Sequence, residues 1–278
     1  MIKILVDSSS EYGMEEIKTN QMELIPISIS MGEQSYMDGV NLDRSQFYEM
    51  LLNGKEFPKT SQPSPQAFLD IFEKAKQKGD SLVCILLSSA LSGTFQSAVL
   101  AKNMVHYDDI YLIDSRSAAV PIKVMAKYAC RLRDTGLSAE EIAEKVEAIK
   151  PKVRLLAALD TLEYLARGGR LNRGVAAIGD IANIKPLITL SEEGEVKVLG
   201  KALGRNKAIH SLLQHLAEFE IDTEFPIYTI YTYGTDNCAR FEKHLAENNY
   251  SVGQRMQIGP TIGTHIGPEA FGMVFVRK

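Results

Sequence analysis

The segment that most constrains the fold spans residues 81–98. Its residues 82–87 form an uninterrupted apolar run of strand length, which is typical of a strand buried on both faces of a parallel sheet. A polar loop follows, with the residues Ser88, Ser89, Ser92, Gly93 and Thr94. A helical pattern then begins at Phe95. In an open α/β sheet, ligands bind in loops of this kind, after a strand and before the next helix.

This loop has the chemistry of an anion site. The N-terminus of the following helix would offer free backbone N–H groups and a positive dipole end. The hydroxyls of Ser92 and Thr94 would add donors. We therefore expect residues 88–94 to hold a small anionic group. An ordinary helix N-cap explains the same residues at this stage, since Ser, Thr and Gly cap helices in many proteins.

Strands and helices alternate through the first half of the chain. Strands are expected at residues 2–6, 24–29, 82–87 and 110–113. Helical patterns separate them, and one helix is expected to begin after Ser64, a good N-cap that is followed by a proline. This alternation favours a mostly parallel sheet with helices on both sides.

The pattern changes after Pro151. A hairpin around residues 192–195 indicates antiparallel pairs. Residues 175–184 are apolar on nearly every side, so we expect them to line a core or a cavity. The fold expected is therefore α/β with two domains, residues 1–151 and residues 152–278.

Composition narrows the class of protein. The 278 residues are 45% apolar and 24% charged, as in soluble globular proteins, and the net charge of −4 argues against a nucleic-acid partner. Three cysteines far apart (Cys84, Cys130 and Cys238) are typical of free thiols in a reducing cytoplasm. No run has the length of a membrane span, the first strand is too short for a signal peptide, and no Cys/His spacing suits a metal. We expect a cytoplasmic protein without a metal.

Four polar spots, each expected in a loop beside glycine or proline, could carry chemistry. They are Thr60-Ser61, residues 88–94, residues 167–173 and residues 261–265. If they converge, their hydroxyls, an arginine and His265 would bind a carboxylate or a phosphate well. Each also has an ordinary structural explanation: a connection, a helix cap, solvated arginines or a histidine with local hydrogen bonds.

A serine nucleophile is the alternative chemistry, with Ser92 and His265 as part of a triad in a serine hydrolase. The Gly-x-Ser-x-Gly elbow is missing, and no orienting acid can be identified. A phosphate- or sugar-binding protein is a third hypothesis, although the phosphate-binding glycine loops of nucleotide sites are absent. We expect binding rather than catalysis.

Taken together, six motifs make the whole chain resemble the DegV family. They are Val-Asp-Ser-Ser at 6–9, Lys-Thr-Ser-Gln-Pro-Ser at 59–64, Ser-Ser-Ala-Leu-Ser-Gly-Thr at 88–94, Asp-Ser at 114–115, Arg-Gly-Gly-Arg at 167–170 and Gly-Thr-His-Ile-Gly-Pro at 263–268. The resemblance implies a two-domain α/β fold with a long-chain fatty acid held between the domains. It also implies a subunit without catalysis or cofactor, which presents the acid to a bacterial fatty acid kinase in phospholipid metabolism and could contact a membrane surface transiently.

The resemblance also implies roles for single residues. Those implied to bind the ligand are Thr60, Ser61, Ser92, Gly93, Thr94, Arg170, Thr264 and His265. Arg170 could instead lie on the surface that faces the kinase. The residues implied to contact the partner are Arg167, Arg173 and Lys201. Residues 175–184 are the candidate wall of the lipid tunnel.

Overall fold

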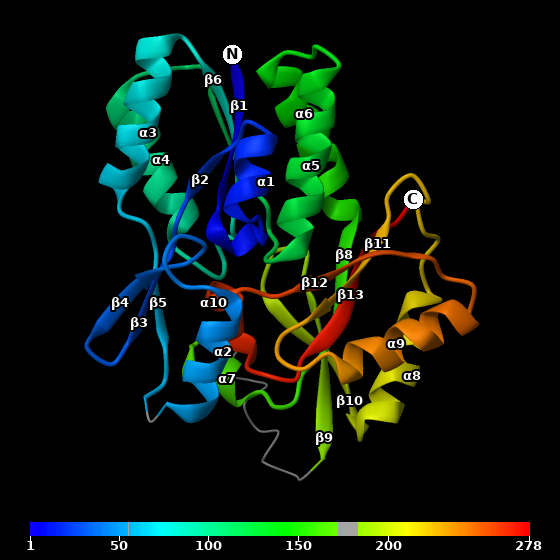
Figure 1. Ribbon diagram of the computed structural model, residues 1–278. Coiled ribbons are helices and arrows are strands. Elements are labelled where there is room, and N and C mark those ends of the chain that lie inside the picture. Colours follow the sequence, from blue (N-terminus) through cyan, green and yellow to red (C-terminus); the bar gives the residue numbers. More distant parts are fainter. Residues whose placement is uncertain (55, 172–182) are drawn as a thin grey trace.

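The computed structural model describes residues 1–54, 56–171 and 183–278. Figure 1 shows an upper part built on a parallel sheet and a lower part built on a larger, mostly antiparallel sheet. The parallel sheet has the strand order β2-β1-β6-β7. Its strands are β1 (Ile2–Asp7), β2 (Glu23–Ile25), β6 (Ser81–Leu86) and β7 (Ile110–Asp114).

Helices cover both faces of the parallel sheet (Figure 1). On one face lie α3 (Pro65–Lys78) and α4 (Thr94–Val105), and on the other lie α1 (Met14–Thr19), α5 (Val120–Asp134) and α6 (Ala139–Ile149). In β6, Cys84 and Leu86 pack with α3 and α4, whereas Val83 and Ile85 pack with α5 and α6. The apolar run that we assigned to a doubly buried strand therefore lies at the centre of this sheet, and the expected parallel arrangement is confirmed.

The second sheet has six strands in the order β10-β9-β8-β13-β11-β12. Its strands are β8 (Val153–Ala158), β9 (Ile184–Leu190), β10 (Val196–Leu203), β11 (Ile227–Tyr231), β12 (Val252–Gln257) and β13 (Phe271–Val276). All neighbouring pairs are antiparallel except β11 with β12, so the expected antiparallel pairs are confirmed. The helices α8 (Arg205–Leu216) and α9 (Asp236–Glu247) cover one face.

The opposite face of the six-stranded sheet packs toward α5. One apolar cluster contains side chains of β1 and β6, of α5, and of β8 and β13, for example Val83, Met125, Leu155 and Val274. This shared core fixes the two sheets relative to each other, and the cavity described below lies between them.

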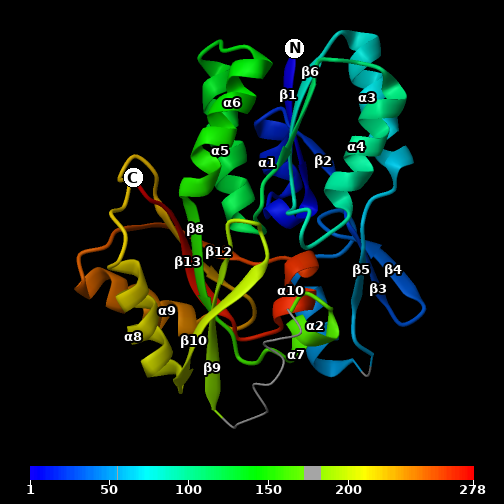
Figure 2. The same ribbon diagram turned by 180° about the vertical axis from the view of Figure 1, so that it is seen from behind.

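A third, three-stranded sheet and several short helices fill the space below the parallel sheet (Figure 2). The strands are β3 (Ser28–Met31), β4 (Gln34–Met37) and β5 (Lys59–Ser61), and the helices include η1 (Ser8–Ser10), α2 (Arg44–Asn53), α7 (Glu163–Arg167) and α10 (Pro260–Ile266). Figure 2 shows α2, α7 and α10 grouped together. Segments far apart in the sequence therefore meet at this point.

Three local expectations were wrong. Residues 24–29 are not one strand, because Pro26 lacks an N–H donor and the chain leaves β2 there before β3 begins. Thr60 and Ser61 lie in β5, which pairs with β3, and not in a loop. Residues 261–265 belong to α10, with Pro260 at its first position.

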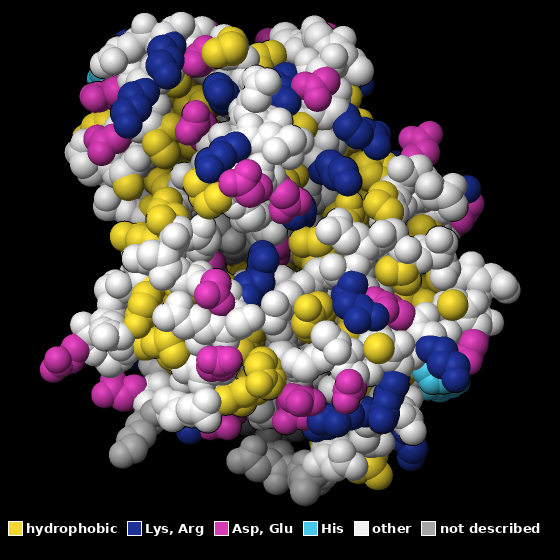
Figure 3. Space-filling view, in the orientation of Figure 1, with side chains coloured by type: hydrophobic (Ala, Val, Ile, Leu, Met, Phe, Trp, Pro, Cys, Tyr) yellow, Lys and Arg dark blue, Asp and Glu magenta, His cyan; other side chains and the backbone are white. Residues whose placement is uncertain are grey.

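The expected domain boundary falls in η2 (Lys150–Lys152), after the last helix on the parallel sheet and before β8. The division into two domains stays a prediction. Basic and acidic side chains are interspersed on the face that Figure 3 shows. Within residues 1–54, 56–171 and 183–278, no helix combines the length and the apolar character that crossing a bilayer requires.

Candidate functional site

A cavity of about 360 Å³ lies between the two larger sheets. Most of its wall is apolar and comes from both halves of the chain: Ile27, Leu87, Leu91, Ala118, Ala119, Leu155, Ala157, Leu159, Leu165, Ile188, Leu190, Val196, Ile230, Ile258, Ile262 and Ile266. The polar residues in the wall are Thr60, Ser61, Gln62, Ser92, Arg170, Thr261 and His265. The cavity is thus suited to a largely apolar ligand that carries a polar group.

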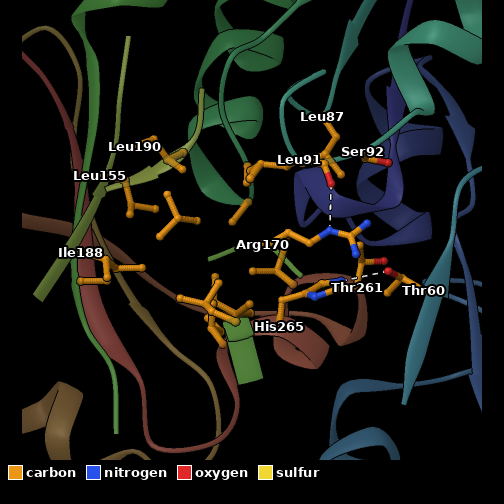
Figure 4. Close-up of a pocket in the computed structure, with 18 of the residues that line it drawn as sticks. Thr60, Leu87, Leu91, Ser92, Leu155, Arg170, Ile188, Leu190, Thr261 and His265 are labelled. Atoms are coloured by element: carbon orange, nitrogen blue, oxygen red, sulfur yellow. Dashed lines mark hydrogen bonds between the residues drawn. The ribbon is translucent and has the colours of Figure 1, made fainter. Parts of the chain in front are cut away.

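The polar side chains gather at one end of the cavity. Figure 4 shows Thr60, Thr261 and His265 on one side, and Leu155 and Ile188 on the opposite side. The polar end is assembled from β5, the loop before α4, the segment after α7, and α10. The ligand group that needs hydrogen bonds therefore has one place to lie.

His265 is the most constrained residue of the polar end. Its Nε2 lies 2.9 Å from the hydroxyl of Thr60, whereas its buried Nδ1 has no hydrogen-bond partner among the described residues. Gly168 makes room for the ring, since a Cβ atom there would lie 2.2 Å from Nδ1. Burial and, to a lesser degree, the charge of Arg170 lower the pKa of His265 to about 4. The imidazole is therefore neutral at physiological pH.

Arg170 links α7 to the loop before α4. Its Nε donates to the carbonyl of Leu91 at 3.0 Å, and its Nη1 donates to the carbonyl of Gly168. These bonds hold the guanidinium at the cavity wall, as Figure 4 shows. Arg170 thus brings a positive charge to the same end as the hydroxyls. Of its two expected positions, site or partner surface, the structure has it in the cavity wall.

Ser92 and Thr94 form a local turn at the start of α4. The two hydroxyls lie 2.9 Å apart, and the Thr94 N–H donates to the Ser92 hydroxyl at 3.3 Å. Gly93 is the N-cap of α4, and a Cβ atom there would lie 2.0 Å from Oε1 of Gln62. Ser92 lines the cavity, whereas Gly93 and Thr94, which were also expected to bind the ligand, do not.

The structure thus brings Thr60, Ser61, Ser92, Arg170 and His265 to one cavity. Thr264 does not line this cavity, and its buried hydroxyl donates to the carbonyl of Pro260 at 2.9 Å. Gln62 and Thr261 also line the cavity. Sequence reasoning named Thr261 only as part of the polar spot at 261–265 and Gln62 only as part of the motif at 59–64, and it gave neither a role in binding. The position of Thr261, one helical turn before His265, could have suggested it once a helix was assigned there.

The residues expected to contact a partner lie elsewhere. Arg167 is exposed on α7, pairs with Glu163 and lies 5.3 Å from the centre of the Phe57 ring. Lys201 is exposed on β10, an edge strand. Arg173 and all of the expected tunnel wall 175–184 except its last two residues lie outside the described residues.

Comparison with known proteins identifies the relatives of this chain. The family model described as "Uncharacterised protein, DegV family" matches residues 1–278. A DegV domain-containing protein of Caldanaerobacter subterraneus subsp. tengcongensis is 38% identical, over all of this chain and 99% of that relative. The chain belongs to the DegV family.

Solved structures of DegV proteins have the same fold. A DegV family protein from Thermus thermophilus, described by its fatty acid binding, superposes with a TM-score of 0.89 at 26% identity, over 100% of this chain and 99% of that one. A stearic-acid-binding protein from Eubacterium ventriosum superposes equally well, with a TM-score of 0.89 at 28% identity and the same coverage. The ligands of these relatives are fatty acids, and no cofactor is indicated.

The geometry in this DegV chain gives a serine hydrolase little support. Ser92 and His265, both described, have Thr94 and Thr60 as their hydrogen-bond partners and do not bond to each other. A base must reach the hydroxyl that it activates. Among the residues that the structure describes, no group of three His, Cys, Asp or Glu side chains could hold a metal ion.

The protonation of His265 can be measured by NMR of its ring, with the signal assigned from the His265→Gln variant. Because burial favours the neutral form, we expect the ring to stay neutral as the pH falls past 6.5 and to titrate only near about 4. In the unfolded chain, His265 has the ordinary pKa of 6.5 and takes up its proton there. The free energy of unfolding should therefore fall as the pH drops from 6.5 toward 4. A midpoint at 6.5 in the folded protein would contradict the buried position.

Proposed function

We propose that this protein is a non-catalytic carrier that binds a long-chain fatty acid and presents it to a fatty acid kinase. The observation that carries the proposal is the cavity of about 360 Å³, which is apolar along most of its wall and polar at one end. Its size falls within the roughly 300–1,000 Å³ of small-molecule sites. The fatty acids bound by solved relatives of the same fold support the same ligand class.

The apolar wall would supply most of the affinity. Burial of each methylene contributes ~0.8 kcal/mol, so ~14 methylenes contribute on the order of 11 kcal/mol before the costs of binding. The side chains opposite the polar end, among them Leu155, Ile188 and Leu190, would contact the tail. The tail would lie between the segments that we assign to two domains, residues 1–151 and residues 152–278.

The polar end would compensate the carboxylate. An ionised carboxylate that is buried without partners is very costly, so it needs donors. The hydroxyls of Thr60, Ser61 and Ser92 can donate, and Arg170 adds a positive charge. His265, which is neutral, can orient Thr60 through their hydrogen bond. We assign Gly93 and Thr94 to the support of Ser92, and we do not assign Thr264 to the ligand.

Presentation to a kinase rests on the resemblance in the sequence motifs and on exposed cations. In acyl-phosphate formation, a carboxylate oxygen attacks the γ-phosphorus of ATP held by the kinase, and ADP leaves. The exposed Arg167 and Lys201 suit an acidic partner surface. The use of ATP and the free, buried thiols of Cys84, Cys130 and Cys238 favour a cytoplasmic location. The role in phospholipid metabolism rests on the resemblance in the sequence motifs alone.

The first test is the ligand itself. The protein, purified from bacteria without detergent, is extracted with organic solvent, and the extract is analysed by mass spectrometry. We expect one long-chain fatty acid per protein molecule, because the apolar wall makes its release slow. A variant with Leu155→Glu and Ile188→Glu, which places charges in the wall, should yield none. An extract without acyl chains, together with no binding of added fatty acid, would remove the proposal.

The second test concerns the head group. Ser92→Ala removes a donor to the carboxylate, and a hydrogen bond to a charged group contributes about 1.5–3 kcal/mol, so the Kd for a fatty acid should rise roughly ten- to hundredfold. Titration calorimetry on delipidated protein measures it. The matched control is Ser89→Ala in the same loop, whose hydroxyl bonds to Asp114 and not to the cavity. Equal affinities for both variants would place the carboxylate elsewhere.

The third test concerns the kinase. Lys201→Glu should lower the rate of acyl-phosphate formation by about tenfold or more, since repulsion replaces attraction, and should leave the Kd for fatty acid unchanged. Lys243→Glu, at an exposed position on α9, is the charge-matched control and should behave as the wild type. An unchanged rate for Lys201→Glu would exclude this face of β10 from the contact.

A further inference from the structure

The first turn of α10 is held by two carboxylates from the beginning of the chain. The Gly259 N–H donates to Oε2 of Glu11 at 2.7 Å. The Thr261 N–H and hydroxyl both donate to Oδ2 of Asp38, at 3.2 Å and 2.5 Å. These bonds cap the N-terminus of α10 with side chains from distant parts of the sequence. Glu11 is 248 residues from Gly259, and Asp38 is 223 residues from Thr261.

Both carboxylates are almost completely buried. Glu11 is 2% exposed and Asp38 is 4% exposed. Burial raises the pKa of Glu11 to about 8 and that of Asp38 to about 6, and the charge of Arg44 opposes both shifts. Buried carboxylates are costly and persist where several groups bind them. Here Arg44 and the Gly259 N–H bind Glu11, and the N–H and hydroxyl of Thr261 bind Asp38, which offsets the cost of burial.

The groups around the two carboxylates fix them in turn. From α2, Arg44 donates to both the carboxylate and the carbonyl of Glu11 at 3.2 Å. From α5, Lys123 donates to the same carbonyl at 3.2 Å and to Glu16 on α1. Glu11 has a φ of +65°, which is unfavourable for a residue with a side chain and is accepted only where the surroundings impose it. Asp38 also bonds to the hydroxyl of Ser8.

α10 depends on such contacts for its position. It has only seven residues, and a helix of this length is unstable on its own. Glycines four residues apart let it pack closely: a Cβ atom on Gly263 would lie 2.6 Å from the Tyr48 hydroxyl, and one on Gly267 would lie 2.4 Å from the Tyr164 ring. α10 is therefore fitted against α2 and α7 and capped by Asp38 and Glu11.

This helix carries Thr261 and His265 to the polar end of the cavity, and neither Asp38 nor Glu11 lines that cavity. We infer that Asp38, assisted by Glu11, is a positioning residue of the fatty-acid site: by holding the first turn of α10 through Thr261, it sets where His265 and the Thr60 hydroxyl bonded to it lie at the polar end of the cavity. The inference rests on the proposed function and extends the site to residues that touch no ligand.

A positioning role and a general contribution to stability predict different effects of a substitution on ligand binding. Misplacement of His265, and of the Thr60 hydroxyl that it orients, weakens binding of a carboxylate, while the apolar wall still holds the tail. A general loss of structure weakens the binding of every ligand that the cavity accepts. The ratio of the Kd of a primary alcohol to the Kd of the fatty acid with the same chain length therefore isolates the positioning role.

The experiment compares palmitate with its alcohol on delipidated full-length protein by calorimetry. We expect Asp38→Ala to lower the preference for the acid by about tenfold or more, because Thr261 loses the acceptor for both its donors. Asp38→Asn keeps an acceptor oxygen and should stay within about threefold of the wild type. Asp80→Ala removes another buried carboxylate, which pairs with the N-terminal amine far from α10, and should leave the preference unchanged.

If Asp38→Ala does not fold, Gly259→Ala replaces it, since the added Cβ would lie 2.9 Å from Oε2 of Glu11 and displace that carboxylate. A lower preference for the acid in the folded variant supports the inference. An unchanged preference, or an equal loss for acid and alcohol, overturns it. A wild-type protein that binds neither palmitate nor the alcohol overturns the proposed function instead.

Discussion

The hydrogen bond between Thr60 and His265 joins two parts of the chain that are 205 residues apart, and the polar end of the cavity depends on it. Thr60 is held by the pairing of β5 with β3, and His265 is held by α10. The neutral imidazole fits this position because a charged one would be buried beside Arg170. The site is therefore built from one cation and several neutral donors, which suits a single negative charge.

The apolar part of the cavity follows from the way the two sheets share a core. Val83 and Ile85 of β6 and Leu155 of β8 belong to one apolar cluster, with α5 packed against both sheets. The cavity wall includes small side chains such as Ala118 and Ala119, which leave room for a ligand. Its apolar side is formed by Leu155, Ile188 and Leu190. A long apolar ligand in this space would extend the core rather than interrupt it.

Local signals predicted much of the fold. The uninterrupted apolar run at 82–87 predicted a doubly buried strand, and side chains pack on both of its faces. Ser64 caps a helix as expected, because capping depends only on residues three or four apart. α10 was missed because a short helix with one glycine inside and one at each end is stabilised by Asp38, Glu11 and Tyr48, which sequence patterns do not bring together.

The site was predicted only in part, because local signals in the sequence do not show which distant segments meet. Ser92 and His265 stood out because polar residues beside glycines interrupt apolar segments. Gln62 and Thr261 line the cavity only because β5 and α10 face each other, while the hydroxyl of Thr264 turns back to its own helix. The fold class and the family could be predicted from the sequence, whereas the orientation of single side chains could be determined only from the tertiary structure.

We propose that a fatty acid lies in the cavity with its carboxylate at Thr60 and Ser92, beside His265. A crystal structure of the protein loaded with a fatty acid that carries bromine at its methyl end tests this directly, because anomalous scattering locates the bromine. We expect the bromine on the apolar side, beside Leu155 and Ile188, with the carboxylate within hydrogen-bond distance of Thr60 or Ser92. A bromine beside His265, or outside the cavity, would contradict it.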